Sequence, residues 1–376
     1  MVAAWTFWLY AFGPSLTLLR DELEFSYLLL GVYAAVLSAG AALSGAIYPR
    51  AARRFNRSPL LWGSALLAAA GAGLFAAGSD VALTMVGAAL LGLAGTTLLT
   101  VTQAILSDQH GARRDRALTE ANVGAAGSAV VAPLALGALA ASPVGWGAAF
   151  VVPLLALAVL YLRYRDVQLA APRRPDAEHS SGRLSTACWL FIGLVAVGMA
   201  VEFCMIYFGA EQLRTTGLSA AVAATALSSY YLGILLGRIG GAIATRRPGR
   251  SVALLHGSIV ATGLGFLLFW LTPASPVAVA GLFLAGVGTA NLYPLSVALA
   301  LAEAPGREDQ ANARTQLLGG LLVTVAPFLL GGLAERLGLK AAFALEGGLI
   351  CLCAVLLVAG LRLRPSVAPD PDPADG

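Results

Sequence analysis

One carboxylate of this chain stands where ionised groups are costly. Glu202 lies in "GMAVEFCMIYFGAEQL" (198–213), sixteen residues into a 24-residue apolar run from Ala187 to Ala210. A helix rises about 1.5 Å per residue and the hydrocarbon core of a bilayer is about 30 Å thick, so this run can span it. Low-dielectric surroundings disfavour the charged carboxylate. We therefore predict that Glu202 takes up and releases a proton near neutral pH; the alternative is a permanently protonated side chain that ties two helices together.

A second candidate is a stripe of polar residues within the apolar run 81–106. Thr96, Thr100, Gln103 and Ser107 follow Gly92 at spacings of four, four, three and four residues, so they share one face of a helix. A polar stripe along a membrane-spanning helix favours a water-filled path, and Thr96, Thr100 and Gln103 are predicted to bind a solute. In the alternative, the hydroxyl groups satisfy carbonyls of their own helix.

Single polar side chains occur in three further apolar runs. Asn122, Asn291, Tyr293 and Gln316 could each hydrogen-bond a neutral polar solute or link two helices. Trp5, Trp8 and Tyr10 could stack on a ring of the solute or anchor a helix at the membrane interface. We predict that the three amides and Tyr293 contribute to a solute site.

The composition determines the class of protein that must hold these residues. Hydrophobic residues make up 58% and charged residues 12% of the 376, and the mean hydropathy is +0.79. A soluble domain carries about 25% charged residues, so the chain is predicted to be an all-α integral membrane protein. The net charge of +4 comes from arginines gathered in particular loops, which orient a membrane protein, so no nucleic-acid partner is predicted.

Enzymatic chemistry has little support in the sequence. The four cysteines lie within apolar runs, the three histidines are scattered, and no G-x-x-x-x-G-K-[ST] loop is present. We therefore predict no catalytic activity, no metal, no cofactor and no ATP-driven step.

Twelve apolar runs are long enough to span a bilayer. They cover 2–19, 27–47, 59–78, 81–106, 117–142, 145–163, 186–210, 219–244, 251–271, 276–302, 310–334 and 341–361. Arginines concentrate in the even-numbered connections, so those face the cytoplasm and both termini lie there. The polar stretch 164–185 is predicted to be a cytoplasmic linker between an N-terminal bundle (1–163) and a C-terminal bundle (186–361), and 362–376 to be a disordered tail.

The two halves repeat each other. An offset of 194 residues aligns "APLALGALA" (132–140) with "APFLLGGLA" (326–334), and "LLGLAGTTLL" (90–99) with "LAGVGTANLY" (284–293). The same offset places Asn122 on Gln316. A duplicated six-helix unit, with a site between pseudo-symmetric halves, is therefore predicted.

With twelve spans in two halves, the chain resembles the major facilitator superfamily over essentially its whole length. "GAIYPRAARRFNR" (45–57) is similar to the superfamily's G-x-x-x-D-R-x-x-R-[KR] signature, with Pro49 in place of the acid, and "LGRIGG" (236–241) occupies the counterpart position. Two stretches, 116–133 and 198–213, also resemble the fucose-permease-type sugar/proton symporters, although the first and fourth runs lack the acids typical of that branch.

The resemblance implies a secondary active transporter in the cytoplasmic membrane. We expect a monomer that moves a small organic solute by alternating access with proton coupling, either by sugar-like uptake or as a drug or metabolite exporter. A non-transporting membrane receptor or assembly partner is the remaining alternative. Because the resemblance implies that the fifth and eighth helices meet, Glu120, Arg238 and Arg314 are predicted to form a cytoplasmic gate when the protein is open to the outside.

Overall fold

The protein is described here from a computed structural model that covers residues 1–78, 80–110, 114–167, 169, 183–246 and 249–364. Within these ranges the regular structure is helical, and twelve helices are long and apolar enough to cross a membrane. The predicted spans are confirmed to within a few residues, for example Val81–His110 and Ser251–Leu271. The chain is therefore a multi-pass membrane protein. Most of the predicted linker and tail, 170–182 and 365–376, lies outside the described residues.

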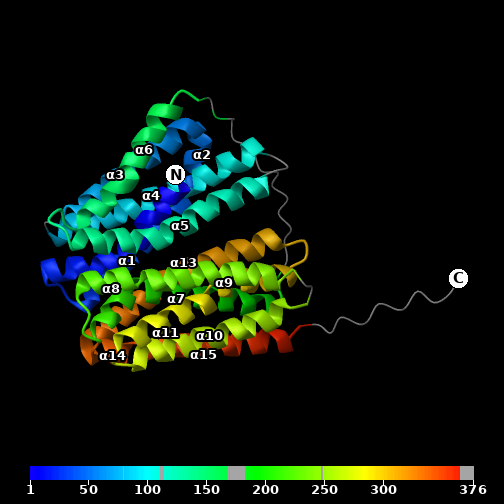
Figure 1. Ribbon diagram of the computed structural model, residues 1–376. Helices are drawn as coiled ribbons and strands as arrows, with labels where there is room; N and C mark the ends of the chain where they lie inside the picture. The colour runs from blue at the N-terminus through cyan, green and yellow to red at the C-terminus, as the bar shows by residue number, and fades with distance from the viewer. Residues whose placement is uncertain (79, 111–113, 168, 170–182, 247–248, 365–376) are drawn as a thin grey trace.

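The N-terminal half contributes six membrane-spanning segments, coloured blue to green in Figure 1. They are α1 (Val2–Leu23), α2 (Tyr27–Arg54), α3 (Arg57–Ala76), α4 (Val81–His110), α5 (Arg114–Ala140), and the 3-10 turn η2 (Trp146–Phe150) continued by α6 (Val151–Tyr164). Ser26 caps α2, because its hydroxyl accepts a hydrogen bond from the Leu29 N–H.

The C-terminal half contributes the other six segments, of which three are interrupted. The helices are α7 (Thr186–Arg214), α8 (Ala220–Ala226), α9 (Ser228–Ala244), α10 (Ser251–Leu271), α11 (Ser275–Thr289), α12 (Leu292–Ala302), α13 (Glu308–Leu337), α14 (Leu339–Ala342) and α15 (Ala344–Arg362). The sequence predicts continuous spans where α8–α9, α11–α12 and α14–α15 stand. At the breaks the backbone remains close to helical, with φ −61° and ψ −21° at Leu227, so hydropathy alone does not reveal them.

The internal repeat is visible in where the helices begin. α4 begins at Val81 and α11 at Ser275, which are 194 residues apart, as are the first residues of α5 and α13, Arg114 and Glu308. Figure 1 shows the two halves as neighbouring groups of helices with α1 and α7 near their boundary. This arrangement is the predicted pair of six-helix bundles.

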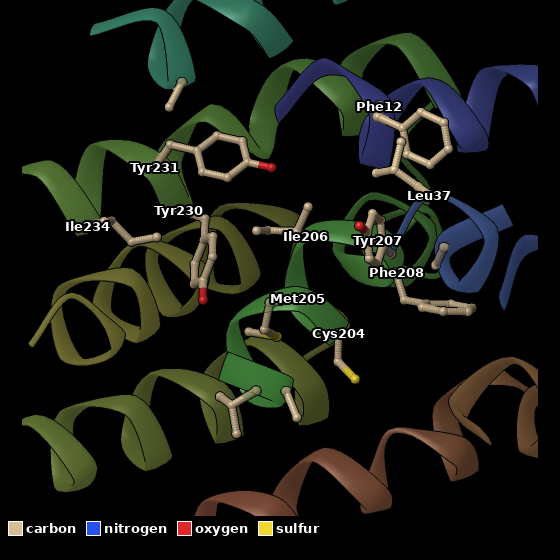
Figure 2. Packing of buried hydrophobic residues seen from close by; sticks show 14 of the residues in the cluster. Phe12, Leu37, Cys204, Met205, Ile206, Tyr207, Phe208, Tyr230, Tyr231 and Ile234 are labelled. Carbon is tan, nitrogen blue, oxygen red and sulfur yellow. The ribbon is translucent and has the colours of Figure 1, made fainter. Parts of the chain in front are cut away.

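Close helix packing and aromatic contacts join the halves. A Cβ atom on Gly13 of α1 would lie 2.1 Å from the Ile206 carbonyl oxygen of α7, so only glycine permits this approach. The Phe12 and Tyr207 rings meet edge to face with their centroids 6.2 Å apart. Figure 2 shows these residues in the buried cluster that also contains Tyr230 of α9.

Candidate functional site

A cavity of about 200 Å³ lies where α1, α4, α5 and α9 approach one another. Four polar side chains without an aromatic ring line it: Thr6 from α1, Gln103 from α4, Asn122 from α5 and Arg238 from α9. Because α1, α4 and α5 belong to the first half and α9 to the second, the cavity lies at the interface of the halves. Its wall can offer hydrogen bonds and one positive charge to a small solute.

Three aromatic rings and several aliphatic side chains complete the wall of the cavity. Trp5 of α1 fits against Gly95 of α4, where a Cβ atom would lie 2.0 Å from the indole ring. Tyr10 of α1 meets Tyr231 of α9 edge to face, with ring centroids 4.7 Å apart. The Trp8 indole instead donates to the Phe150 carbonyl and is fully buried, so its role is structural.

Glu202 lies behind the Tyr10 side of this wall. The Tyr10 hydroxyl donates a long hydrogen bond of 3.5 Å to Oε1 of Glu202. The Arg238 guanidinium, on the cavity wall, interacts electrostatically with the Glu202 carboxyl. The structure therefore brings a membrane-embedded acid, a phenol and a guanidinium together at one side of the cavity.

The threonines of the predicted α4 stripe lie in a different setting from Gln103. Thr96 and Thr100 are both half-buried, and the Thr100 hydroxyl donates to the Thr96 carbonyl at 2.8 Å. Neither is among the residues that line the cavity. The geometry is that of a hydroxyl satisfying its own helix.

The predicted polar residues of α12 and α13 make contacts between helices. Asn291, at the break between α11 and α12, is buried and donates its amide to the Gly237 carbonyl of α9 at 3.1 Å. The Gln316 amide of α13 donates to the Tyr293 hydroxyl of α12 at 3.1 Å. These three side chains do not line the cavity around Gln103 and Asn122.

Of the predicted gate residues, Arg238 of α9 lines the cavity. Its side chain is exposed, as are those of Glu120 of α5 and Arg314 of α13. Near Arg314, the backbone N–H groups of Glu308 and Gly306 hold the pKa of the exposed Glu308 carboxyl below its usual value. Pairing of Glu120 with Arg238 in an outward-open state stays a prediction.

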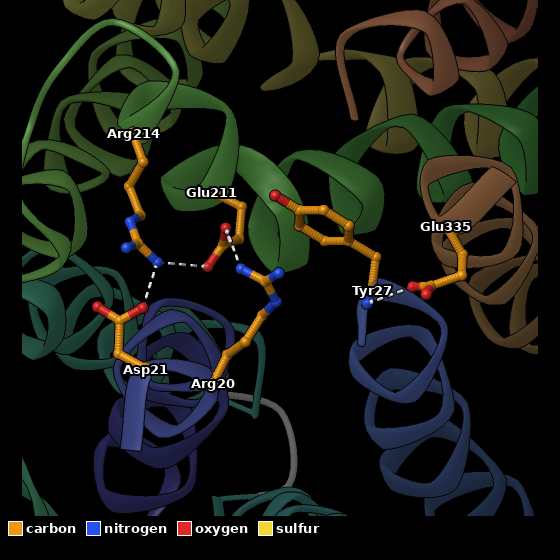
Figure 3. A network of polar contacts seen from close by, with 6 residues as sticks. All are labelled: Arg20, Asp21, Tyr27, Glu211, Arg214 and Glu335. Atoms are coloured by element: carbon orange, nitrogen blue, oxygen red, sulfur yellow. Dashed lines mark hydrogen bonds and ion pairs between the residues drawn. The ribbon is translucent and has the colours of Figure 1, made fainter. Parts of the chain in front are cut away.

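A cluster of charges joins the halves at the end of α1 and α7 away from the cavity. The Arg214 guanidinium contacts the Asp21 carboxylate at 2.6 Å and the Glu211 carboxylate at 3.4 Å, and Arg20 contacts Glu211 at 3.3 Å. Glu211 is only 2% exposed, so its two arginine partners offset its desolvation. We call these four residues the ion-pair cluster, which Figure 3 shows between α1 and α7.

Contacts to the neighbouring helices α2 and α13 adjoin the ion-pair cluster. The Arg20 guanidinium lies 4.0 Å above the centre of the Tyr27 ring, and the Tyr27 N–H donates to the Glu335 carboxylate of α13 at 3.0 Å (Figure 3). The sequence analysis missed this cluster. The signal was available, since "LRDELE" (19–24) and "AEQLR" (210–214) end the first helices of the two repeats.

The signature loop around Pro49 has a different ion pair in place of its missing acid. Arg57, which is 8% exposed, contacts the Asp108 carboxylate of α4 at 2.8 Å and donates to the Tyr48 hydroxyl at 2.9 Å. The start of α3 is thereby fixed to the end of α4.

A family model provides the deciding comparison. The model described as Major Facilitator Superfamily matches residues 1–212 and again 190–376. The chain belongs to the major facilitator superfamily. It is therefore a membrane transporter by family and fold. The double match also follows the internal repeat.

Solved structures of other superfamily transporters share the fold. A bacterial homologue of the human lysosomal transporter Spinster, in an inward-facing and occupied conformation, is 16% identical, with a TM-score of 0.75 over 98% of this chain and 97% of that one. The nucleoside transporter NupG, as a point mutant, is 15% identical, with a TM-score of 0.73 over 96% of each chain. At these identities the likeness concerns the fold alone.

A curated relative shows the same class of protein. The uncharacterized transporter y4wD of Sinorhizobium fredii is 29% identical over an alignment of 196 residues. This alignment covers 47% of this chain. The match spans about half the length of that relative, 48%.

Proposed function

We propose that this protein is a proton-coupled transporter that moves a small polar organic solute by alternating access, with both termini in the cytoplasm. The observation that supports it best is the cavity between the halves, with Gln103 and Asn122 on its wall and Glu202 bonded to Tyr10 at its side. Hydrogen-bonding groups provide solute recognition, and the membrane-embedded acid provides a site for the proton.

The conformation proposed is inward-open. The arginine-rich connections assign the end where α1 begins to the cytoplasm, and the cavity is lined by the first residues of α1, from Val2 to Tyr10. At the opposite end, the ion-pair cluster holds α1 against α7. Alternating access then requires two changes. The ion-pair cluster must separate, and the cytoplasmic end of the cavity, where Glu120, Arg238 and Arg314 are predicted to form the gate, must close.

The size and polarity of the cavity favour a sugar-like or polyol solute. Its volume of about 200 Å³ is below the roughly 300–1,000 Å³ of sites for drug-sized ligands. Gln103 and Asn122 suit hydroxyl groups, and Trp5 can cover the apolar face of a sugar ring. The alternative is a proton-driven exporter of an aromatic drug or metabolite, which the three rings of Trp5, Tyr10 and Tyr231 favour.

A ligand-stabilisation screen tests the substrate class. Sugars and polyols, organic acids, and lipophilic cations are added separately to the purified protein, since a binder raises the melting temperature. We expect a member of the sugar and polyol group to stabilise the protein; stabilisation by lipophilic cations alone would favour the exporter.

Two matched variants test whether the solute binds in the cavity. Asn122→Ala removes a hydrogen-bonding group from the wall and should lower solute affinity about tenfold, as expected for one lost hydrogen bond. Thr100→Val, whose hydroxyl bonds to its own helix, should leave the affinity unchanged. Equal losses in both variants would contradict the assigned site.

A further inference from the structure

A second carboxyl within a membrane-spanning segment, which the sequence analysis did not single out, is more completely buried in the protein than Glu202. Glu346, in the first turn of α15, is 0% exposed. Among the described residues, neither of its carboxylate oxygens makes a hydrogen bond of standard geometry, and the side-chain partner of its carboxyl is the Cys204 thiol. An unpaired ionised carboxylate in such a place costs far more free energy than its neutral form. The neutral, protonated form is therefore the one that this setting favours.

The groups that face Glu346 provide no counter-charge. They are Cys204 of α7, Tyr230 of α9 and Cys353, two turns further along α15. The Cys204 thiol interacts with the Glu346 carboxyl, but a thiol is only a weak hydrogen-bond donor. From α10, which also packs on α15, His256 is exposed and its ring nitrogen contacts the Val252 carbonyl of its own helix. Among these groups, nothing compensates an ionised Glu346.

Packing alone does not account for an acid at this position. A buried neutral carboxyl without a hydrogen bond loses the interactions with water that it makes when unfolded, whereas an apolar side chain of similar size has no such cost. Glu346 stands among buried apolar residues, including Ile350. The property that a carboxyl has and an apolar side chain of similar size lacks is the ability to bind and release a proton.

The Tyr230 side chain lies between this acid and Glu202 in its electrostatic interactions. Tyr230 interacts electrostatically with both Glu346 and Glu202. Its hydroxyl is buried, and its side-chain partner among the described residues is Thr289, at a geometry short of a standard hydrogen bond. Figure 2 shows the Tyr230 and Tyr231 side chains of α9 beside the α7 segment that carries Met205 and Ile206. From Glu202, the bond to Tyr10 leads to the cavity wall.

We propose that Glu346 is a second proton-binding site of the transport cycle, loaded in the conformation seen here. When α7, α9 and α15 move against one another, the O–H bond at Glu346 breaks and its proton passes to water or, by way of the Tyr230 hydroxyl, to an ionised Glu202. Glu346 is then left as the carboxylate, and a proton from the opposite side reloads it. This inference rests on the proposed function, because it assigns a further site to proton coupling.

Infrared spectroscopy of the purified protein in lipid vesicles, without solute, tests the site directly. The carbonyl stretch of a protonated carboxyl is separate from that of a carboxylate. We expect a protonated-carboxyl band that is present in the wild type, lost in Glu346→Gln, kept in the control Glu24→Gln, and weakened as the pH is raised. The control acid is exposed in the connection between α1 and α2.

Three results would overturn the proposal. A band unchanged in Glu346→Gln means that Glu346 is ionised. A band lost in that variant but constant over the pH titration means a permanently protonated, structural acid. A band that disappears when sodium replaces potassium means a cation site. Should Glu346→Gln not fold, Glu346→Asp keeps the carboxyl and must shift the band, and an unshifted band counts against the assignment. Because no solute is present, these outcomes are independent of whether Glu202 couples transport to protons.

Discussion

The hydroxyl of Tyr10 is the link between the cavity and Glu202. It donates to Oε1 of Glu202, while its ring packs on Tyr231. Tyr10→Phe removes the donor and keeps the ring, so the fold should lose less than about 1 kcal/mol of stability. We expect proton-driven solute uptake in vesicles to fall while the melting temperature stays near that of the wild type. Undiminished uptake would show that this bond does not serve coupling.

For the stripe on α4, the sequence predicts which side chains share a helix face but not which of them reach the cavity. Gln103 and Thr100 belong to one predicted stripe, yet the Gln103 side chain reaches the cavity and the Thr100 hydroxyl bonds to its own helix. A short hydroxyl can find a carbonyl one turn away, whereas a longer amide reaches past the backbone. Glu346 was missed because it lies near the start of an apolar run, where an acid resembles an ordinary interfacial charge.

Among the helices, the contact of α1 with α7 depends on the ion-pair cluster. Arg214→Gln removes charge-assisted contacts to Glu211, which is buried, and to Asp21, which is 43% exposed. The contact to Glu211 is of a kind typically worth about 1.5–3 kcal/mol, and the exposed one contributes no more than about 1 kcal/mol. We expect the conformational equilibrium to shift at least about tenfold toward the state in which this end is open. Spin labels at Glu24 and Thr215, in a cysteine-free background, should report a longer distance in the variant. An unchanged distance distribution would mean that the cluster does not hold the end closed.

Backbone packing between the same helices gives an independent test. In Gly13→Ala the new methyl group would lie 2.1 Å from the Ile206 carbonyl oxygen, so α1 and α7 must separate. The control is Gly63→Ala in α3, where the added Cβ meets nothing within 4 Å and alanine favours the helix by up to about 1 kcal/mol. We expect Gly13→Ala to lower the melting temperature or open the ion-pair end, and Gly63→Ala to do neither. Wild-type behaviour of Gly13→Ala would contradict the observed packing.

The helices themselves were the most predictable part of the fold. Long apolar runs determine the twelve spans, and duplication explains the shared offset of α4 with α11 and of α5 with α13. The breaks at Leu227, Asn291 and Phe343 were not predicted, because a turn with nearly helical angles changes neither length nor hydropathy. The ion-pair cluster also required the structure: the charges at the ends of the first and seventh spans are visible in the sequence, but the sequence does not show that they pair with one another.

For the whole molecule, alternating access requires the two halves to have a defined orientation in the membrane. The arginine distribution predicts that Ser180, which lies outside the described residues, is cytoplasmic and that Thr215, after α7, faces the opposite side. In intact cells, a cysteine introduced at Thr215 should react with a membrane-impermeant thiol reagent, and a cysteine introduced at Ser180 should not. Reaction of the Ser180 position from outside would reverse the topology and, with it, the inward-open assignment.

Proton coupling at Glu202 is the central claim, and transport by Glu202→Gln in reconstituted vesicles tests it most directly. Glutamine keeps the size of the side chain and can accept the Tyr10 hydrogen bond, but it cannot exchange a proton. With the solute identified by the stabilisation screen, we predict that the variant still exchanges internal for external solute and no longer accumulates it under a pH gradient. Full accumulation by Glu202→Gln would contradict the account.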